Sequence, residues 1–147
     1  MDARIERQRA IVAEHVRAEN EHNWPAVHDT FVQNERAFYD VIPLQSTFKG
    51  IEGVRQFYAV IATALPDLNI RITAQYDSPG CTVCETEITG THLGPYLDQP
   101  ASGNPIKIQL AAIYLFNEDC SKLVAERIYY DQASVMAQMQ QKQARSA

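Results

Sequence analysis

The chain has 147 residues, of which 46% are hydrophobic and 21% are charged, and its net charge is −5 at neutral pH. This composition is typical of a globular protein, and the length predicts one domain over residues 1–147. The negative charge argues against binding to nucleic acid or to an anionic membrane, because phosphate groups are held by basic surfaces. No run of about 18 apolar residues predicts a membrane span. The 3 cysteines form no disulfide framework, which favours the cytoplasm.

The first part of the chain is predicted to be helical. Apolar residues at helical spacing predict a helix from Ala3 to Asn20. His15 lies beside this apolar stripe, and we expect it to be a stripe-edge residue rather than a ligand. A short second helix is expected next, capped by Asn23 or Trp24, because a proline follows in its first turn, where the missing N–H does no harm.

Short strands and a third helix are predicted next. The segments Ala37–Ile42 and Gln45–Phe48 have the composition of short strands. The segment Ile51–Ala64 has a broad apolar stripe at helical spacing, which predicts a core-facing helix. Pro66 is expected to end this helix, because the residue before a proline avoids the helical conformation.

Four long strands are predicted in the second half, joined as successive hairpins. They are Leu68–Tyr76, Cys81–His92, Ile106–Asn117 and Lys122–Asp131. The connection Leu93–Pro105 is long and rich in glycine and proline, and such loops are often lids or binding loops. A short helix, Gln132–Met139, and a polar tail from Gln140 follow. This order predicts an α+β fold with helices on one face of an antiparallel sheet.

The last predicted strand ends at a carboxylate, Asp131, where strand gives way to helix. A carboxyl group in a desolvated pocket can act as a general acid or base near neutral pH. Asp is also a preferred N-cap residue, so a helix cap is the alternative. A buried Asp131 facing an apolar cavity would favour chemistry, whereas an exposed one bonded to the amides of Ser134 or Val135 would favour the cap.

Strand alternation divides the end of this strand into two faces. One face carries Arg127, Tyr129 and Asp131, and the other carries Glu126, Ile128 and Tyr130. The alternation leaves open which face is concave. We expect Arg127 to form a structural salt bridge with Glu85 or Glu87 on another strand.

His92 is a second candidate, at a strand end beside the long loop. A histidine there can donate a hydrogen bond or relay a proton near neutral pH, and a hydrogen-bonded structural histidine is the alternative. Cys81 and Cys84 form a lone CxxC on a strand, where their thiols point to opposite faces, so we expect no metal site. Motifs for dinucleotides, P-loops and serine hydrolases are absent.

Five segments together carry a resemblance to a known family. They are Phe48–Tyr58, Leu65–Leu68, Gly90–Gly94, Ser102–Gly103 and Glu126–Asp131, with Gln138 following. The chain resembles the SnoaL-like polyketide cyclase (ester cyclase) family of the nuclear transport factor 2-like superfamily. The resemblance implies a cone, also described as a cystatin-like α+β roll. Three N-terminal helices pack on a curved, mostly antiparallel sheet around a deep pocket, and a short C-terminal helix follows.

The resemblance also implies an activity: acid/base-catalysed intramolecular aldol ring closure of a small apolar, polyketide-like carbonyl compound, with no cofactor and no metal. Asp131 corresponds to the catalytic acid/base of such cyclases, and His92 to a histidine at the pocket. The residues expected to bind the substrate are Tyr39, Trp24, Tyr129 and Phe57. The family's usual homodimer is expected too, and the apolar strand Ile106–Phe116 is consistent with burial on both faces.

Two alternatives stay open. One is a non-catalytic module of the same fold that binds a small ligand or serves in assembly. The other is an isomerase or hydrolase that uses the same pocket. Epoxide hydrolases of the superfamily use an Asp-Arg-Asp set that needs Arg-x-Asp on a neighbouring strand. The corresponding strand here reads Lys107-Ile-Gln109, which weakens that reading.

Overall fold

The computed structural model describes residues 1–142. Its helices are α1 (Ala3–Asn20), α2 (Trp24–Asp29), α3 (Gly50–Ala64) and α4 (Gln132–Gln140), with a 3-10 turn, η1 (Ile42–Leu44). Its strands are β1 (Phe38–Val41), β2 (Ser46–Lys49), β3 (Asn69–Ser78), β4 (Cys81–Thr91), β5 (Pro105–Phe116) and β6 (Leu123–Tyr130). These bounds confirm the predicted order of elements. Most of the predicted polar tail lies outside the described residues.

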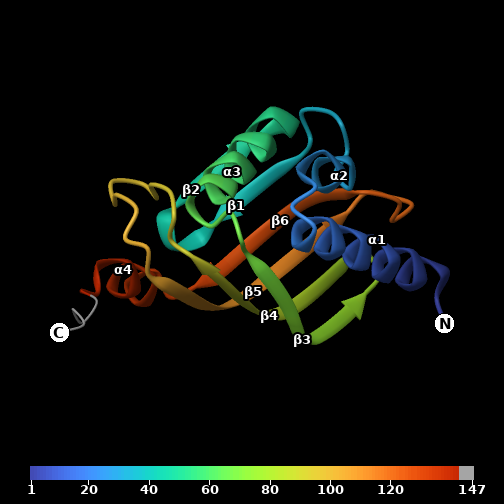
Figure 1. Cartoon of the computed structure of the whole chain (residues 1–147). Coiled ribbons are helices and arrows are strands. Elements are labelled where there is room, and N and C mark those ends of the chain that lie inside the picture. Colours follow the sequence, from blue (N-terminus) through green and yellow to red (C-terminus); the bar gives the residue numbers. More distant parts are fainter. Residues whose placement is uncertain (143–147) are drawn as a thin grey trace.

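One curved six-stranded sheet, in the order β2-β1-β6-β5-β4-β3, organises the molecule. Helices α1, α2 and α3 lie on one side of it, which we call the concave face (Figure 1). The loop between β4 and β5 lies at the same end of the sheet as α4, and the N-terminus lies at the opposite end (Figure 1). The α+β arrangement predicted from the sequence is therefore confirmed.

Local sequence explains where the helices begin and end. The Asp2 side chain accepts a hydrogen bond from the backbone N–H of Arg4 at the start of α1. At the start of α2 the cap is Asn23, whose side chain accepts from the backbone N–H of Ala26. These contacts satisfy amides that have no partner within the helix. Helix α3 ends at Ala64, two residues before Pro66, as predicted.

The sheet is mostly antiparallel, and its irregularities accompany its curvature. Strands β3 to β6 pair as an antiparallel meander, whereas β1 pairs with β6 in parallel and with β2 antiparallel. The register shifts between Ile72 and Ala74, where β3 has the extra residue, and between Leu115 and Phe116, where β6 has the extra residue. Such bulges bend the bulged strand and increase its twist. The bent sheet partly encloses the space beneath the helices.

The pairing also settles which face of β6 is concave. Glu126, Ile128 and Tyr130 face the helices, and Arg127 lies on the outer, convex face, where its Nε is 3.0 Å from an Asp40 oxygen. The structural salt bridge expected for Arg127 is confirmed, but its partner is Asp40 rather than Glu85 or Glu87. Strand β6 lies between β5 and β1, so the residue opposite Arg127 in register is Asp40 of β1 rather than a residue of β4.

The loop of residues 92–104 is held against the end of α3. The backbone N–H groups of Leu93 and Gly94 both lie within hydrogen-bonding distance of the Ala64 carbonyl. A Cβ on Gly94 would lie 2.0 Å from the carbonyl oxygen of Thr63, so a side chain at this position requires the loop to move. Gly94 thereby permits a close backbone contact that fixes the start of the loop.

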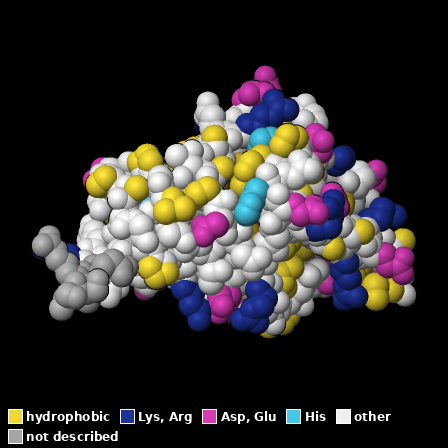
Figure 2. Space-filling view, viewed as in Figure 1, with side chains coloured by type: hydrophobic (Ala, Val, Ile, Leu, Met, Phe, Trp, Pro, Cys, Tyr) yellow, Lys and Arg dark blue, Asp and Glu magenta, His cyan; other side chains and the backbone are white. Residues whose placement is uncertain are grey.

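The surface in view is mixed in charge. Figure 2 shows Lys and Arg side chains interspersed with Asp and Glu rather than gathered into one basic patch. Several of these charges are paired, for example Arg71 and Lys107 with Glu87. Among residues 1–142, no helix has the length and apolar character needed to cross a membrane.

Candidate active site

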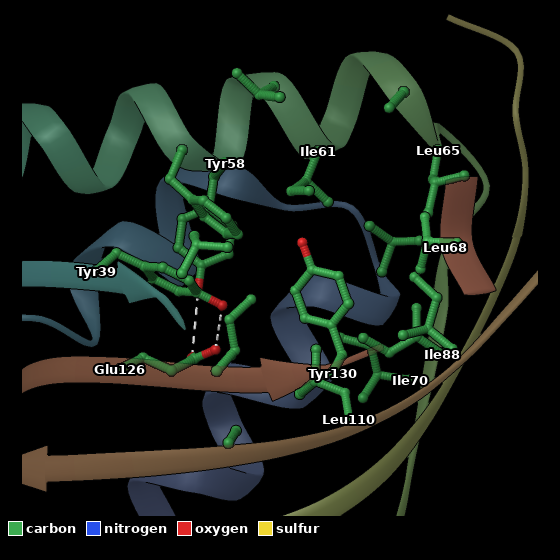
Figure 3. Close-up of a pocket in the computed structure, with 18 of the residues that line it drawn as sticks. Tyr39, Tyr58, Ile61, Leu65, Leu68, Ile70, Ile88, Leu110, Glu126 and Tyr130 are labelled. Atoms are coloured by element: carbon green, nitrogen blue, oxygen red, sulfur yellow. Dashed lines mark hydrogen bonds between the residues drawn. The ribbon is translucent and has the colours of Figure 1, made fainter. Parts of the chain in front are cut away.

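A cavity of about 140 Å³ lies between α3 and the concave face of the sheet (Figure 3). A single water needs roughly 10–15 Å³, so this space is large enough for a small organic molecule. Most of its lining is apolar and comes from α3, strands β3 to β6 and α4. Val60 and Leu97 belong to the lining and are themselves exposed, so they mark where the cavity meets solvent.

The charged residues of the lining are both acidic. Glu19 of α1 and Glu126 of β6 line the cavity, and neither Lys nor Arg is among its described lining residues. A ligand carboxylate or phosphate would therefore meet no Lys or Arg in the described lining, and its desolvation cost would be high. The cavity is suited to a neutral apolar molecule, or to one with a positive charge.

Glu126 is the centre of a buried polar cluster at one end of the cavity (Figure 3). Its side chain is almost fully buried, and both carboxyl oxygens have partners. The Tyr39 hydroxyl donates to Oε2 at 2.5 Å, while Tyr58 donates to Oε1 at 3.4 Å. His15 Nε2 lies 3.0 Å from Oε1. We call Glu126, His15, Glu19, Tyr39 and Tyr58 the polar floor.

The hydrogen bonds of His15 indicate that it is an imidazolium. The Thr30 hydroxyl donates to the Val27 carbonyl at 2.6 Å, so it accepts from His15 Nδ1, 2.8 Å away. His15 Nε2 faces Glu19 at 3.2 Å and Glu126 at 3.0 Å. Burial disfavours the charged ring, but the negative charge of Glu19 and the hydrogen bond to Glu126 outweigh it and raise the pKa of His15 to about 10. Both ring nitrogens are therefore donors.

Glu19 differs from Glu126 in its surroundings. Its side chain is buried, and its one hydrogen-bonding partner among the described residues is His15. Burial raises the pKa of the Glu19 carboxyl above its ordinary value; the nearby His15 opposes this shift, and the charge of Glu126 adds to it. Two carboxyl groups thus face one imidazolium, which favours one ionised and one protonated carboxyl group.

Such a pair can provide an acid and a base in one site. Glu126 accepts hydrogen bonds at both oxygens, and burial raises the pKa of the Glu19 carboxyl, which favours the protonated form of Glu19. A carboxyl group that accepts hydrogen bonds beside a buried carboxyl group of raised pKa offers a base and an acid to one ligand. Burial, followed by the charge of Glu126, raises the pKa of Tyr39 and Tyr58 well above the ordinary value, so both remain hydroxyl donors.

Asp131 lies outside this cluster. It is exposed, it is not among the residues that line the cavity, and its side chain accepts a hydrogen bond from the Ser134 backbone N–H at 3.1 Å. This is the geometry of an N-cap at the start of α4. Of the two roles considered for Asp131, its position favours the cap, and its catalytic role stays a prediction.

His92 is also not among the residues that line the cavity. It is fully buried, and its Nδ1 lies 2.8 Å from the Ser102 hydroxyl oxygen, across the loop of residues 92–104. The Ser102 backbone N–H donates to the same nitrogen at 3.3 Å. Nε2 is buried without a hydrogen-bond partner in the described structure. These contacts tie the two sides of the loop together and match the structural alternative for His92.

Of the four residues expected to bind the substrate, two line the cavity and two do not. Tyr39 and Phe57 line the cavity and stack on one another, with ring centroids 3.7 Å apart. Trp24 is not in the lining; it packs beside Tyr58 in the adjoining core. Tyr129 is exposed on the convex face, and its neighbour in sequence, Tyr130, enters the cavity instead.

The expectation for His15 was wrong, and the sequence contained the signal that corrects it. Val12 and Val16 define the buried stripe of α1, and both are buried. His15 and Glu19 follow Val12 at i+3 and i+7, so they belong to the same buried face. For Glu126 the signal was its position on the strand face shared with Ile128 and Tyr130. Polar residues in a buried stripe need partners, and here they partner one another.

In the described part of the chain, no group of three or more His, Cys, Asp or Glu side chains could hold a metal ion. At the polar floor, His15 donates protons from both ring nitrogens and offers no lone pair to a metal. The three cysteines are free: Cys84 and Cys120 are buried, and Cys81 is half-buried.

Comparison with known proteins adds a family and a fold. The family model described as SnoaL-like polyketide cyclase matches residues 9–139. A putative SnoaL-like polyketide cyclase from Jannaschia sp. CCS1 aligns with TM-score 0.85 and 18% identity, over 95% of each chain. A hypothetical protein with a ketosteroid isomerase-like fold from Catenulispora acidiphila, in complex with trimethylamine, aligns with TM-score 0.72 and 19% identity, over 88% of this chain and 91% of that one.

A further solved structure is that of SalBIII, described as an epoxide hydrolase/cyclase-like enzyme with a role in pyran ring formation in the polyether salinomycin. It aligns with TM-score 0.72 and 16% identity, over 88% of this chain and 94% of that one. At such identities these likenesses show the fold, and they confirm the expected nuclear transport factor 2-like cone. Among curated protein sequences, none matches this chain.

Proposed function

Because the chain belongs to the SnoaL-like polyketide cyclase family, we propose that it catalyses acid/base ring closure of a small apolar carbonyl compound by intramolecular aldol addition. The observation that carries the proposal is the buried polar floor at one end of an otherwise apolar cavity. The ring-forming role described for SalBIII supports such chemistry in a pocket of this fold. The fold alone does not fix an activity, so the proposal rests on the site.

In the proposed reaction, the Glu126 carboxylate accepts a proton from the carbon next to the substrate carbonyl. The C–H electron pair moves into an enolate, and protonated Glu19 donates a hydrogen bond to the enolate oxygen. The enolate carbon then attacks a second carbonyl carbon of the same molecule and forms the new C–C bond. The oxygen of that carbonyl receives the proton from Glu126, which returns the carboxylate to its first state.

The neighbouring groups have positioning roles in this scheme. The His15 imidazolium holds both carboxyl groups, and Tyr39 fixes the second oxygen of Glu126. Each positioned acid or base contributes typically about 10²–10⁴-fold in rate. The apolar walls keep water from the enolate, which would otherwise be protonated before ring closure.

The first step can be tested without knowing the substrate. Wild-type protein in D₂O is expected to exchange the protons next to the carbonyl of methyl nonyl ketone for deuterium, as followed by NMR. Glu126→Gln should slow this exchange by about 10²-fold or more, because an amide is a poor base. Asp131→Asn, which changes an exposed carboxylate, should leave exchange within a few-fold of wild type.

The same pair of variants tests the earlier prediction for Asp131. If Asp131→Asn abolishes exchange while Glu126→Gln does not, the catalytic base is Asp131 and the polar floor is structural. Circular dichroism checks that both variants fold. An absence of exchange in the wild type for methyl ketones and aryl ketones alike would contradict proton abstraction altogether.

A second candidate is a binding module without chemistry. The cavity combines aromatic side chains with two carboxyl groups and no described Lys or Arg lining residue, which is a favourable environment for a small amine. The trimethylamine complex of the Catenulispora acidiphila protein supports this alternative. Saturable binding of trimethylamine by calorimetry, with no exchange of any ketone, would favour it.

We also propose, for the whole molecule, a cytoplasmic homodimer built from one domain over residues 1–147. Support for the dimer comes from the convex face of β4 and β5, where Val83, Ile113 and Leu115 are only half-buried. Tyr76 and Tyr129 lie on the same face with more than 40% of their surface exposed. An apolar strip of this kind favours association through the sheet.

A further inference from the structure

Two tyrosine hydroxyls meet inside the cavity, away from the polar floor. Tyr130 comes from β6 and Tyr96 from the loop of residues 92–104, and both line the cavity. Their hydroxyl oxygens lie 3.1 Å apart. Figure 3 shows the Tyr130 ring standing in the middle of the cavity, with its hydroxyl directed towards α3. We call these two hydroxyls the tyrosine pair.

The tyrosine pair has a hydrogen to spare. Each phenol carries one hydrogen, and the bond between the two oxygens uses only one of the two hydrogens. Neither hydroxyl has another hydrogen-bond partner in the described structure. A buried donor without an acceptor is unfavourable, so the pair is ready to bind an acceptor on a ligand. Tyr96 is 93% buried, because only 7% of its surface is exposed.

The remainder of the cavity offers few competing polar groups. Thr86 lines it, but its hydroxyl donates to the Leu110 carbonyl at 3.1 Å. Tyr130 follows Glu126 by four residues on the same strand face, so their Cα atoms are about 13 Å apart at roughly 3.3 Å per residue. Ile128 lies between them on that face. The cavity thus has two separate polar positions joined by an apolar span.

The loop that carries Tyr96 is fixed rather than free. Leu93 and Gly94 bond to the end of α3, and His92 is tied to Ser102 across the base of the loop. Near the tip, the backbones of Tyr96 and Gln99 exchange two hydrogen bonds of 2.9 Å each. These contacts hold the Tyr96 ring in place, so its hydroxyl is preorganised for a ligand.

We propose that the tyrosine pair is a second ligand-binding position that takes a carbonyl oxygen, so that the substrate is a neutral, apolar compound with two separated carbonyl groups. This inference rests on the proposed function, in which one carbonyl is enolised at the polar floor. The spare hydroxyl hydrogen would bind a carbonyl oxygen remote from the reacting carbons, because the two polar positions are about 13 Å apart along the strand, and would orient the chain between them.

The test compares straight-chain methyl ketones with diketones of equal length that carry a methyl ketone at each end. Compounds built on pentyl, heptyl and nonyl chains vary the distance between the two carbonyl groups of the diketone. Binding is followed by the fluorescence of Trp24, the single tryptophan, whose ring lies 5.9 Å from that of Tyr58 at the polar floor. Wild type should bind the diketone of best-fitting length about 2- to 10-fold more tightly than its monoketone, the usual range for one hydrogen bond.

Substitution identifies the groups responsible. Tyr96→Phe and Tyr130→Phe each leave one hydroxyl and one hydrogen, so each variant should keep part of the preference for the diketone over the monoketone. The double variant should lose it and bind both ketones equally. Tyr129→Phe is the matched control, because Tyr129 is adjacent in sequence but exposed on the convex face, and it should behave as wild type. Thermal melts check that the variants fold.

The outcomes separate this inference from the proposed function. If the monoketone binds and exchanges its protons but no diketone is preferred at any length, the tyrosine pair is not a ligand position, and the proposed function stands. A preference that survives in the double variant also overturns the inference. A preference that the double variant loses, without any proton exchange, supports the ligand position and contradicts the enzyme. If no ketone binds, both proposals fail.

Discussion

His15 carries a positive charge inside the protein, and this charge makes folding stability depend on pH. Its folded-state pKa of about 10 lies above the ordinary value of 6.5. The stabilisation is therefore complete below about pH 6.5 and is lost as the pH rises through 10. The raised pKa of Glu19 acts in the same direction, because the folded protein holds that proton more tightly. Alkaline conditions should weaken the fold.

The variant His15→Gln tests this expectation. Removing the cation leaves two buried carboxyl groups facing one another, so we expect a loss of about 3–5 kcal/mol in the free energy of unfolding at pH 6.5. The difference between wild type and variant should shrink towards pH 10, where wild-type His15 is losing its proton. Urea denaturation at a series of pH values measures this. A constant difference across the series would contradict the imidazolium.

Among individual residues of the cavity, the sequence predicted some and missed others, and each outcome has a physical reason. Tyr39 and Phe57 were predicted because they are aromatic residues in elements that face the core, and both line the cavity. Glu126 was missed because alternation gives two faces without saying which is concave. That information comes from the neighbours of β6 in the sheet, which are β5 and β1, and non-local pairing is not written in the strand itself.

At the scale of the element, the loop of residues 92–104 depends on one close contact. Gly94→Ala would place a methyl group against the Thr63 carbonyl, so the loop must shift. We expect a loss of about 1–3 kcal/mol in stability, as for other overpacked sites. Weaker binding of the diketone probe should accompany it, because Tyr96 moves with the loop. Thermal unfolding and the Trp24 fluorescence titration measure the two effects.

Gly103→Ala provides the control within the same loop. Gly103 has φ of +73°, and nothing lies within 4 Å of the position that a Cβ would take, so alanine there strains the backbone without pushing the loop from α3. It should destabilise by about 1 kcal/mol and leave probe binding unchanged. Equal loss of binding in both variants would mean that general loosening of the loop, rather than its contact with α3, positions Tyr96.

The elements themselves were predicted well because their signals are local. The apolar stripe of the helix predicted from Ile51, the stop at Pro66 and the period-two pattern of β3 each lie within a short segment, and the structure confirms these elements. The role of Asp131 could not be decided in the same way. The same carboxylate at a strand end serves a pocket or a cap, and the choice depends on where α4 lies relative to the cavity.

At the scale of the whole molecule, the convex face of the sheet is the surface on which the proposed homodimer depends. Val83, Ile113 and Leu115 form its apolar centre on β4 and β5. Val83→Asp would place a carboxylate in a dimer interface, opposite Tyr76 and Ile113 in register rather than a basic side chain, and desolvating it without a partner costs several kcal/mol. We therefore expect a dimer in the wild type and a monomer in this variant at the same concentration, measured by light scattering after size exclusion.

Leu93→Asp is the matched control, because Leu93 is an exposed leucine in the loop of residues 92–104 rather than on the convex face. It should remain dimeric. A monomeric wild type at every concentration would contradict the dimer.

Proton exchange adds a second measurement, because the polar floor is built from α1, α3, β1 and β6 of a single chain. A monomeric but folded Val83→Asp variant should therefore keep its exchange activity, and loss of that activity would mean that the partner subunit helps to form the site.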